Sequence, residues 1–211
     1  MRITTEKGKK DKIHIYVDGE YKMTVDEAFW FSQGIPEKSE IGEEELADLE
    51  NSVVSRRAFN KAVDIISQRE HSKREVITKL IQRGYSRETA QAATEKLEEY
   101  GYIDDVRFAS LFARELKERK KFGKGRIKQE LMRKGISRET ADSVLSEIEE
   151  DPCREITEIL RKKYPSLRED EKIRNRAFNA LLRYGYGISD VRNAINSFDN
   201  GEEEYYDIED F

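Results

Sequence analysis

The sequence has few of the residues on which redox chemistry and metal binding usually depend. Its 211 residues include one Cys, one Trp, two His and three Pro. Because Cys153 is the only cysteine, no disulfide forms within the chain, and a reducing compartment is expected. His14 and His71 lie far apart in the sequence, and neither has a second ligand at metal-binding spacing. We therefore expect neither a metal nor a cofactor.

Long apolar runs and catalytic motifs are also missing. No stretch approaches the roughly 20 apolar residues that a membrane helix needs, and the N-terminus lacks the apolar segment of a signal peptide. Residues 123–126 (Gly-Lys-Gly-Arg) have neither the preceding strand nor the spacing of a phosphate-binding loop. Carboxylates scattered over helix faces are usually solvated charge rather than a catalytic pair. We expect a cytoplasmic protein that is not an enzyme and does not contact a membrane.

The charge of the chain is unevenly distributed. Its formal net charge is −5, yet residues 199–211 contain seven acids and no Lys or Arg. The rest of the chain has 39 Lys or Arg and 37 Asp or Glu, a net charge of +2. Residues 114–134 alone hold ten Lys or Arg against three Glu. An acidic tail behind a mildly basic body is typical of interaction proteins.

The N-terminal residues predict a small β structure. Apolar residues alternate over 13–17 and again over 21–25, and Asp18-Gly19 between them is a type I′ turn signal. Residues 2–5 are a candidate third strand. A hairpin alone is marginal in water, so a following helix should cover it. The apolar residues that this helix offers are Ala28, Phe29, Trp30 and Phe31.

The rest of the chain repeats. Residues 81–90 (IQRGYSRETA) and 132–141 (MRKGISRETA) are nearly identical, and 182–191 (LRYGYGISDV) is a looser third copy. Their glycines, Gly84, Gly135 and Gly185, are spaced by 51 and 50 residues. The apolar positions before these glycines are Val76, Leu80 and Ile81; Ile127, Leu131 and Met132; and Ala177, Leu181 and Leu182. In the first helix of each copy they are Phe59, Ala62, Val63 and Ile66; Ala109, Phe112, Ala113 and Leu116; and Ile156, Ile159 and Leu160. This spacing predicts helices with one buried face.

The predicted fold is therefore mainly all-α. It has three tandem three-helix repeats, stacked into an elongated curved rod, after a small N-terminal β-hairpin plus helix. The expected divisions are 1–42 for the hairpin and helix, 43–103, 104–150 and 151–198 for the repeats, and 199–211 for the acidic tail. A monomer is expected.

The basic run in the middle repeat is the candidate contact surface. Lys and Arg on exposed helices often only solubilise a protein. Here they concentrate at one joint, where they could meet phosphates or an acidic protein surface. The candidate contacting residues are Arg114, Lys117, Lys120, Lys121, Lys124, Arg126 and Lys128.

Two patterns allow a second interpretation. Residues 72–97 have the outline of a helix-turn-helix, although the joint recurs three times with different flanking charges, which favours a structural repeat. Tyr100 and Tyr102 could stack on bases, whereas Phe108 and Phe112 are expected in the core.

Several motifs in order resemble those of the RecX family. They are 101–109 (GYIDDVRFA), 121–123 (KFG), 127–136 (IxxELxxKGI) and 72–84 (SxxExxxKLxxxG), and they cover residues 58–150 closely. The motif residues that the resemblance singles out, with a structural role as the alternative, are Tyr102, Asp104, Asp105, Arg107 and Phe108.

The resemblance implies a cytoplasmic regulator of the RecA recombinase, active in DNA repair and the SOS response. Family members are thought to lie in the helical groove of the RecA–single-stranded DNA filament and to inhibit ATP hydrolysis, coprotease activity and strand exchange. Weak DNA binding is compatible with this role. The alternatives are an autonomous nucleic-acid-binding module and a helical scaffold for another protein. Replacing Lys120, Lys121, Lys124 and Arg126 by Ala is expected to weaken inhibition without changing helicity.

Overall fold

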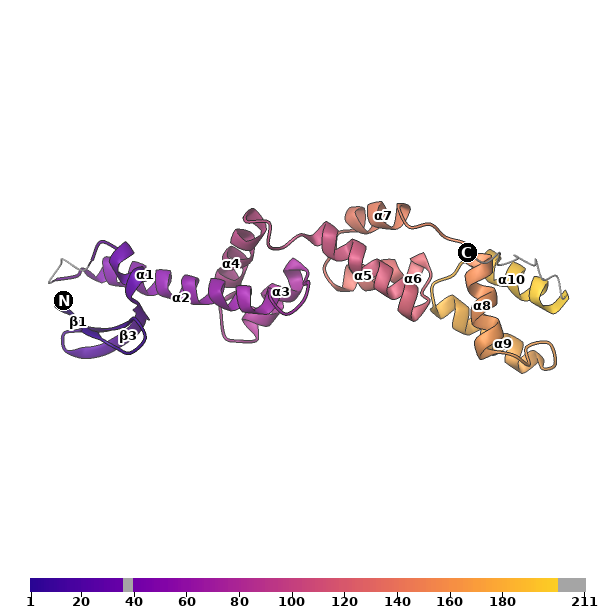
Figure 1. Ribbon diagram of the computed structural model, residues 1–211, viewed down its shortest axis with the longest axis horizontal. Helices are drawn as coiled ribbons and strands as arrows, with labels where there is room; N and C mark the ends of the chain where they lie inside the picture. The colour runs from indigo at the N-terminus through magenta and orange to yellow at the C-terminus, as the bar shows by residue number, and fades with distance from the viewer. Residues whose placement is uncertain (36–39, 201–211) are drawn as a thin grey trace, which may run out of the picture. The chain divides into compact units, whose positions relative to one another are not determined.

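The structure is a computed structural model that describes residues 1–35 and 40–200 (Figure 1). The chain forms two compact units. The first unit comprises Met1–Arg69 and Val76–Tyr102, and the second comprises Glu70–Glu75 and the chain from Ile103 onward. The predicted acidic tail, apart from its first two residues, lies outside the described residues.

The first unit opens with a three-stranded antiparallel sheet in the order β1-β2-β3. Its strands are β1 (Ile3–Lys7), β2 (Lys12–Val17) and β3 (Glu20–Asp26). Asp18 and Gly19 form the two-residue turn between β2 and β3, with φ of 51° and 84°. These positive values suit a type I′ turn, whose twist matches that of the strands. The predicted hairpin and its candidate third strand are confirmed.

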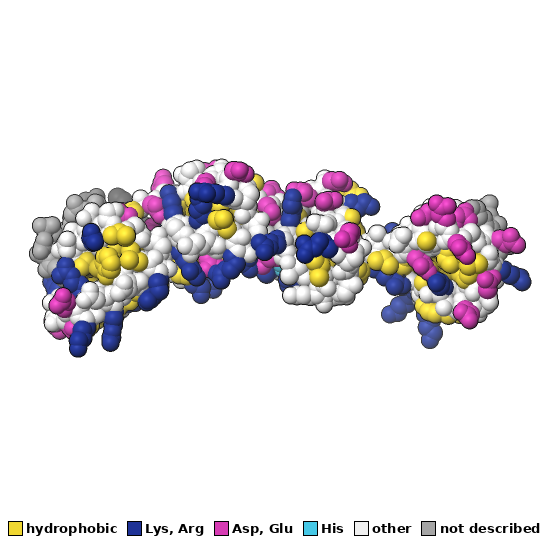
Figure 2. All heavy atoms as spheres, turned by 180° about the vertical axis from the view of Figure 1, so that it is seen from behind, with side chains coloured by type: hydrophobic (Ala, Val, Ile, Leu, Met, Phe, Trp, Pro, Cys, Tyr) yellow, Lys and Arg dark blue, Asp and Glu magenta, His cyan; other side chains and the backbone are white. Residues whose placement is uncertain are grey.

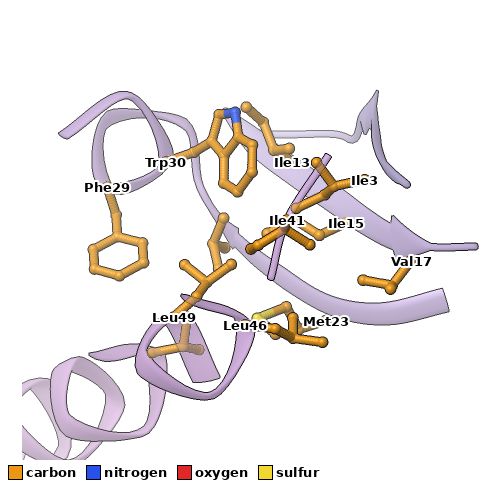
Figure 3. Packing of buried hydrophobic residues seen from close by; sticks show 12 residues of the cluster. Ile3, Ile13, Ile15, Val17, Met23, Phe29, Trp30, Ile41, Leu46 and Leu49 are labelled. Carbon is orange, nitrogen blue, oxygen red and sulfur yellow. The ribbon is translucent and has the colours of Figure 1, made fainter. Parts of the chain in front are cut away.

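One face of the sheet packs against two helices, α1 (Glu27–Ser32) and α2 (Glu43–Ile66). Figure 3 shows Ile13, Ile15 and Met23 of the sheet facing Trp30 of α1 and Leu49 of α2. Four consecutive helical residues cannot all face one side, because each turns the direction by about 100°. Phe29 and Trp30 are buried, but Ala28 and Phe31 are exposed, so the predicted apolar contribution of those two residues is wrong.

Helix α2 contributes to two hydrophobic cores in the first unit. Leu46, Leu49 and Val53 belong to the sheet core. The second half of α2 packs against α4 (Arg87–Glu99). Figure 1 shows α2 running without a break from the sheet to α4. The predicted boundary between residues 42 and 43 stays a prediction. Helix α2, which begins at this boundary, packs against the sheet that precedes it and against α4 that follows it.

The buried face of this half-helix differs from the predicted one by one residue. Ala58, Ala62 and Ile65 are buried, whereas Val63 is 36% exposed. The glycine spacing of 51 relates these three positions to Ala109, Ala113 and Leu116 of the middle repeat. The predicted set of Phe59, Ala62, Val63 and Ile66 used a spacing of 50, which turned the helix by about 100°.

The second unit contains the middle and third repeats. The middle repeat is α5 (Asp105–Lys120), α6 (Lys124–Arg133) and α7 (Arg138–Ser146), and the third is α8 (Pro152–Lys163), α9 (Glu171–Arg183) and α10 (Ile188–Asn200). Each repeat has its own hydrophobic core. The first repeat consists of the second half of α2, α3 (Lys73–Ile81) and α4. The predicted fold class, mainly helical repeats after an N-terminal sheet, is confirmed.

The joints between the second and third helices follow the predicted chemistry. Gly84, Gly135 and Gly185 have φ of 90°, 91° and 92°, the left-handed conformation that ends a helix. One part of the predicted stripe is wrong. Ile81 and Met132 are 39% and 45% exposed, and Leu182 is half-buried. They sit in the last helical turn, where the neighbouring Leu80, Leu131 and Leu181 already occupy the core face.

Candidate interaction surface

The basic run lies on the second half of α5, on the joint after it and on α6. Lys121 ends α5 in the left-handed conformation, with φ of 55°. Gly123 then caps α6, and its N–H donates to the carbonyl oxygen of Tyr184 at 2.9 Å. The joint between α5 and α6 of the middle repeat is therefore hydrogen-bonded to the joint between α9 and α10 of the third repeat.

Three of the seven candidate residues form ion pairs with acids around α8. Nζ of Lys117 lies 3.0 Å from Glu155, Nζ of Lys124 lies 3.5 Å from Glu150, and Nζ of Lys121 lies 3.9 Å from Glu158. Lys117 also donates to the carbonyl oxygen of Glu149. Lys117 and Lys124, whose pairs are partly buried, link the middle and third repeats, and acidic side chains already offset the charge of all three lysines.

Two further candidates are paired within the middle repeat. The guanidinium group of Arg126 lies 2.8 Å from Glu130 and 5.7 Å from the centre of the Phe122 ring. Lys128 pairs with Asp142 of α7. Glu130 is only 8% exposed and also binds Arg133, so two guanidinium groups compensate its burial.

Arg114 and Lys120 are the exceptions. Both are exposed on α5, and neither side chain has a hydrogen bond or an ion pair with another described residue. Five of the seven predicted side chains are thus paired, and two have no ion pair or hydrogen bond with another described residue. The acids that pair with Lys117, Lys121 and Lys124 lie well beyond the basic run in the sequence, so a count of charges could not show this division.

Tyr186 is a functional candidate that the sequence pattern did not reveal. Its ring is 6% exposed, and its hydroxyl lies 3.2 Å from both the carbonyl oxygen of Lys121 and a carboxylate oxygen of Glu155. Burial, and then the negative charge of Glu155, raise the pKa of this phenol well above its ordinary value. The phenol stays neutral and donates across the joint.

Three of the five motif residues, Asp104, Asp105 and Arg107, have structural partners among the described residues. Oδ1 of Asp104 accepts from the backbone N–H groups of Val106 and Arg107 and so caps α5. Oδ1 of Asp105 accepts from the N–H of Lys73, and Arg107 lies 3.2 Å from Glu70. In the same unit Lys134 pairs with Glu75 at 2.6 Å. These contacts attach residues 70–75 to the middle repeat.

The aromatic residues separate as expected. Phe108 is buried and stacks on Phe112, with ring centres 5.6 Å apart. Tyr100 and Tyr102 are 60% and 58% exposed and meet edge to face. Base stacking by these tyrosines stays a prediction.

Charged and hydrophobic side chains are intermixed on the face drawn in Figure 2. Figure 2 shows Lys and Arg side chains, in dark blue, over both repeats of the second unit. Among residues 1–35 and 40–200, no group of three or more His, Cys, Asp or Glu is arranged to hold a metal. Within the same ranges, no helix is both long and apolar enough to cross a membrane.

Comparison with known proteins identifies the family. Residues 58–97 match the first three-helix domain of RecX, and residues 104–145 match the second. A protein from Caldanaerobacter subterraneus subsp. tengcongensis named regulatory protein RecX is 30% identical over 190 residues, covering 89% of this chain and 94% of the relative. The chain belongs to the RecX family.

Other relatives agree with the assignment. The regulatory protein RecX of Clostridium tetani is 28% identical over 200 residues and covers 92% of both chains. A crystal structure of regulatory protein RecX superposes with a TM-score of 0.74 at 22% identity, covering 93% of this chain and 98% of the other. RecX from Lactobacillus salivarius gives a TM-score of 0.61 at 20% identity over 70% of this chain and 97% of the other. These two structures share the fold.

Proposed function

We propose that this RecX protein binds the RecA–single-stranded DNA filament in its helical groove and inhibits RecA ATP hydrolysis, coprotease activity and strand exchange. The observation that carries this proposal is the match to both RecX domains and to relatives named regulatory proteins. Binding takes place in the cytoplasm, with the protein as a monomer. Inhibition follows from occupying the groove that a second DNA must enter, and it requires no catalysis.

The basic run supports an electrostatic contact with the filament. Arg114 and Lys120 make this contact, because their charges are exposed and unpaired among the described residues. Lys117 and Lys124 act indirectly by fixing the third repeat against the middle one, through pairs that are at most 33% exposed. Exposed charges of this kind act mainly on the rate of encounter and on salt dependence.

The test is the ATPase activity of RecA on single-stranded DNA, with this protein added at substoichiometric amounts over a range of salt. Falling ATP hydrolysis that is relieved by salt is the expected result. An ATPase rate that stays constant at every salt concentration would sink the proposal. A scaffold for an unrelated protein predicts that constant rate, and an autonomous DNA-binding module predicts inhibition that excess single-stranded DNA abolishes.

A further inference from the structure

A cleft in the second unit lies between the joint that connects α5 with α6 and the joint that connects α9 with α10. It has a volume of about 460 Å³ and is open to solvent. This size falls within the range of clefts that hold small ligands. The residues that shape its chemistry are Phe122, Arg126, Gln129, Arg183 and Tyr184.

Backbone contacts hold the two walls of this cleft together. The N–H of Gly123 donates to the carbonyl oxygen of Tyr184 at 2.9 Å. On Gly185, a Cβ would come within 2.1 Å of the backbone nitrogen of Arg126, so only glycine fits there. These backbone contacts fix the two segments that carry the side chains lining the cleft.

Aromatic rings form the apolar part of the cleft. Phe122 and Tyr184 are half-buried and meet edge to face, with their centres 5.7 Å apart. Nζ of Lys163 lies 5.0 Å from the centre of the Tyr184 ring and 2.8 Å from its hydroxyl. Because the two rings are inclined at 61° to each other, one of them can stack on a planar group while the other meets its edge.

Two guanidinium groups form the charged part. Nε of Arg126 is buried and has no hydrogen-bond partner among the described residues. One of its two terminal nitrogens, Nη2, forms an ion pair with Glu130. The Arg126 side chain as a whole is 37% exposed and lines the cleft, so the outer part of its guanidinium group is open to a ligand. Arg183 is exposed, with no ion pair or hydrogen bond to another described residue. Guanidinium groups bind phosphate oxygens in a planar, two-point geometry.

We propose that this cleft binds one unpaired nucleotide of a single strand, with the base against Phe122 and Tyr184 and a phosphate on Arg183 and Arg126. Rings beside arginines are the usual arrangement for sequence-tolerant single-strand binding, since every base has a π-face. A duplex keeps its bases stacked inside and cannot offer one to the cleft. This inference rests on the proposed binding to the RecA–single-stranded DNA filament and places a contact with the single strand in this cleft.

The experiment measures binding of a fluorescent oligothymidine of about 15 nucleotides to the full chain without RecA, by fluorescence anisotropy at low salt. Arg183→Ala should weaken binding roughly tenfold. The matched control is Arg192→Ala on α10, which removes an equal charge from an exposed site that does not line the cleft. The control should stay within about twofold of the unaltered protein, as expected for a loss of long-range charge alone.

A second pair of variants tests the ring rather than the charge. Tyr184→Phe keeps the π-face and should bind as the unaltered protein does, whereas Tyr184→Leu keeps apolar volume but should lose most single-strand binding. Helical circular dichroism should be unchanged in all four variants.

Three outcomes would overturn the assignment. They are equal losses for Arg183→Ala and Arg192→Ala, duplex binding as tight as single-strand binding, and binding of an acidic peptide to the cleft in place of the oligonucleotide. None of these outcomes decides whether the protein inhibits RecA, because the ATPase assay measures that separately.

Discussion

Gly185 packs directly against the backbone of Arg126. A Cβ at this position would lie 2.1 Å from the nitrogen and 2.8 Å from the Cα of Arg126, and φ of Gly185 is 92°. Gly84 occupies the equivalent joint of the first repeat with φ of 90°, but nothing lies within 4 Å of its would-be Cβ. The two glycines share a conformation and differ in their surroundings.

Gly185→Ala should therefore cost more than Gly84→Ala. Left-handed φ alone costs an L-residue about 1–2 kcal/mol, and the backbone clash at residue 185 should raise the loss to about 3–5 kcal/mol. Urea denaturation followed by circular dichroism measures both free energies of unfolding. Equal losses would mean that the joints of the middle and third repeats do not touch.

Tyr186→Phe should destabilise the second unit by about 1–3 kcal/mol at neutral pH, because the hydroxyl bonds Lys121 and Glu155. The pKa of Tyr186 is raised in the folded protein, so its stabilising effect is fully present below the ordinary value of 10.0 and is lost as pH rises above it. The difference in unfolding free energy between the two proteins should shrink between neutral pH and strongly alkaline pH. A difference that stays constant would contradict the assigned role.

Glu155→Gln should lower stability by about 1–2 kcal/mol, because Glu155 pairs with Lys117 at a site where both side chains are at most 25% exposed. Glu158→Gln is the matched control, since its pair with Lys121 at 3.9 Å is more than 40% exposed on both sides. Exposed pairs contribute little, so the control should change stability by less than about 0.5 kcal/mol. Thermal unfolding at low and high salt compares the two, and a larger loss for Glu158→Gln would reverse the ranking.

The double variant Arg114→Ala with Lys120→Ala should require about five- to tenfold more protein for the same inhibition of RecA ATPase activity. Its stability should be nearly unchanged, because both side chains are exposed and neither has a hydrogen bond or an ion pair with another described residue. Lys172→Ala with Arg176→Ala on α9 removes the same charge from another exposed helix and serves as the control. Identical inhibition by both double variants would show that net charge, rather than position, governs the interaction.

The helical repeats were predictable because residue identity and apolar spacing agree around Gly84, Gly135 and Gly185. These glycines end helices for a local reason, their left-handed φ, and local reasons are visible in sequence. The one-residue error at Phe59 and Ile66 arose where the helix of the first repeat is continuous with an earlier segment, so no cap marks its start.

The candidate surface was only partly predictable. Counting Lys and Arg located the basic run but could not show which charges meet acids that follow later in the chain. Lys117 and Glu155 are 38 positions apart and pair only because α5 and α8 meet through the folded joint. Tyr186 and Arg183 lie in the third copy of the repeat, but that pattern does not single them out, since their importance comes from burial and from a cleft lined by two separate joints.

Helix α2 has a consequence for how the protein unfolds and how it can be shortened. Leu46 and Leu49 complete the sheet core, while Ala58 and Ala62 at the other end of the same unbroken helix pack in the first repeat. Deleting the sheet would expose the first pair to water and fray the helix from its N-terminus, which removes support from the second pair. The first unit should therefore melt in a single cooperative transition, and limited proteolysis should not release its β-sheet as a separate fragment.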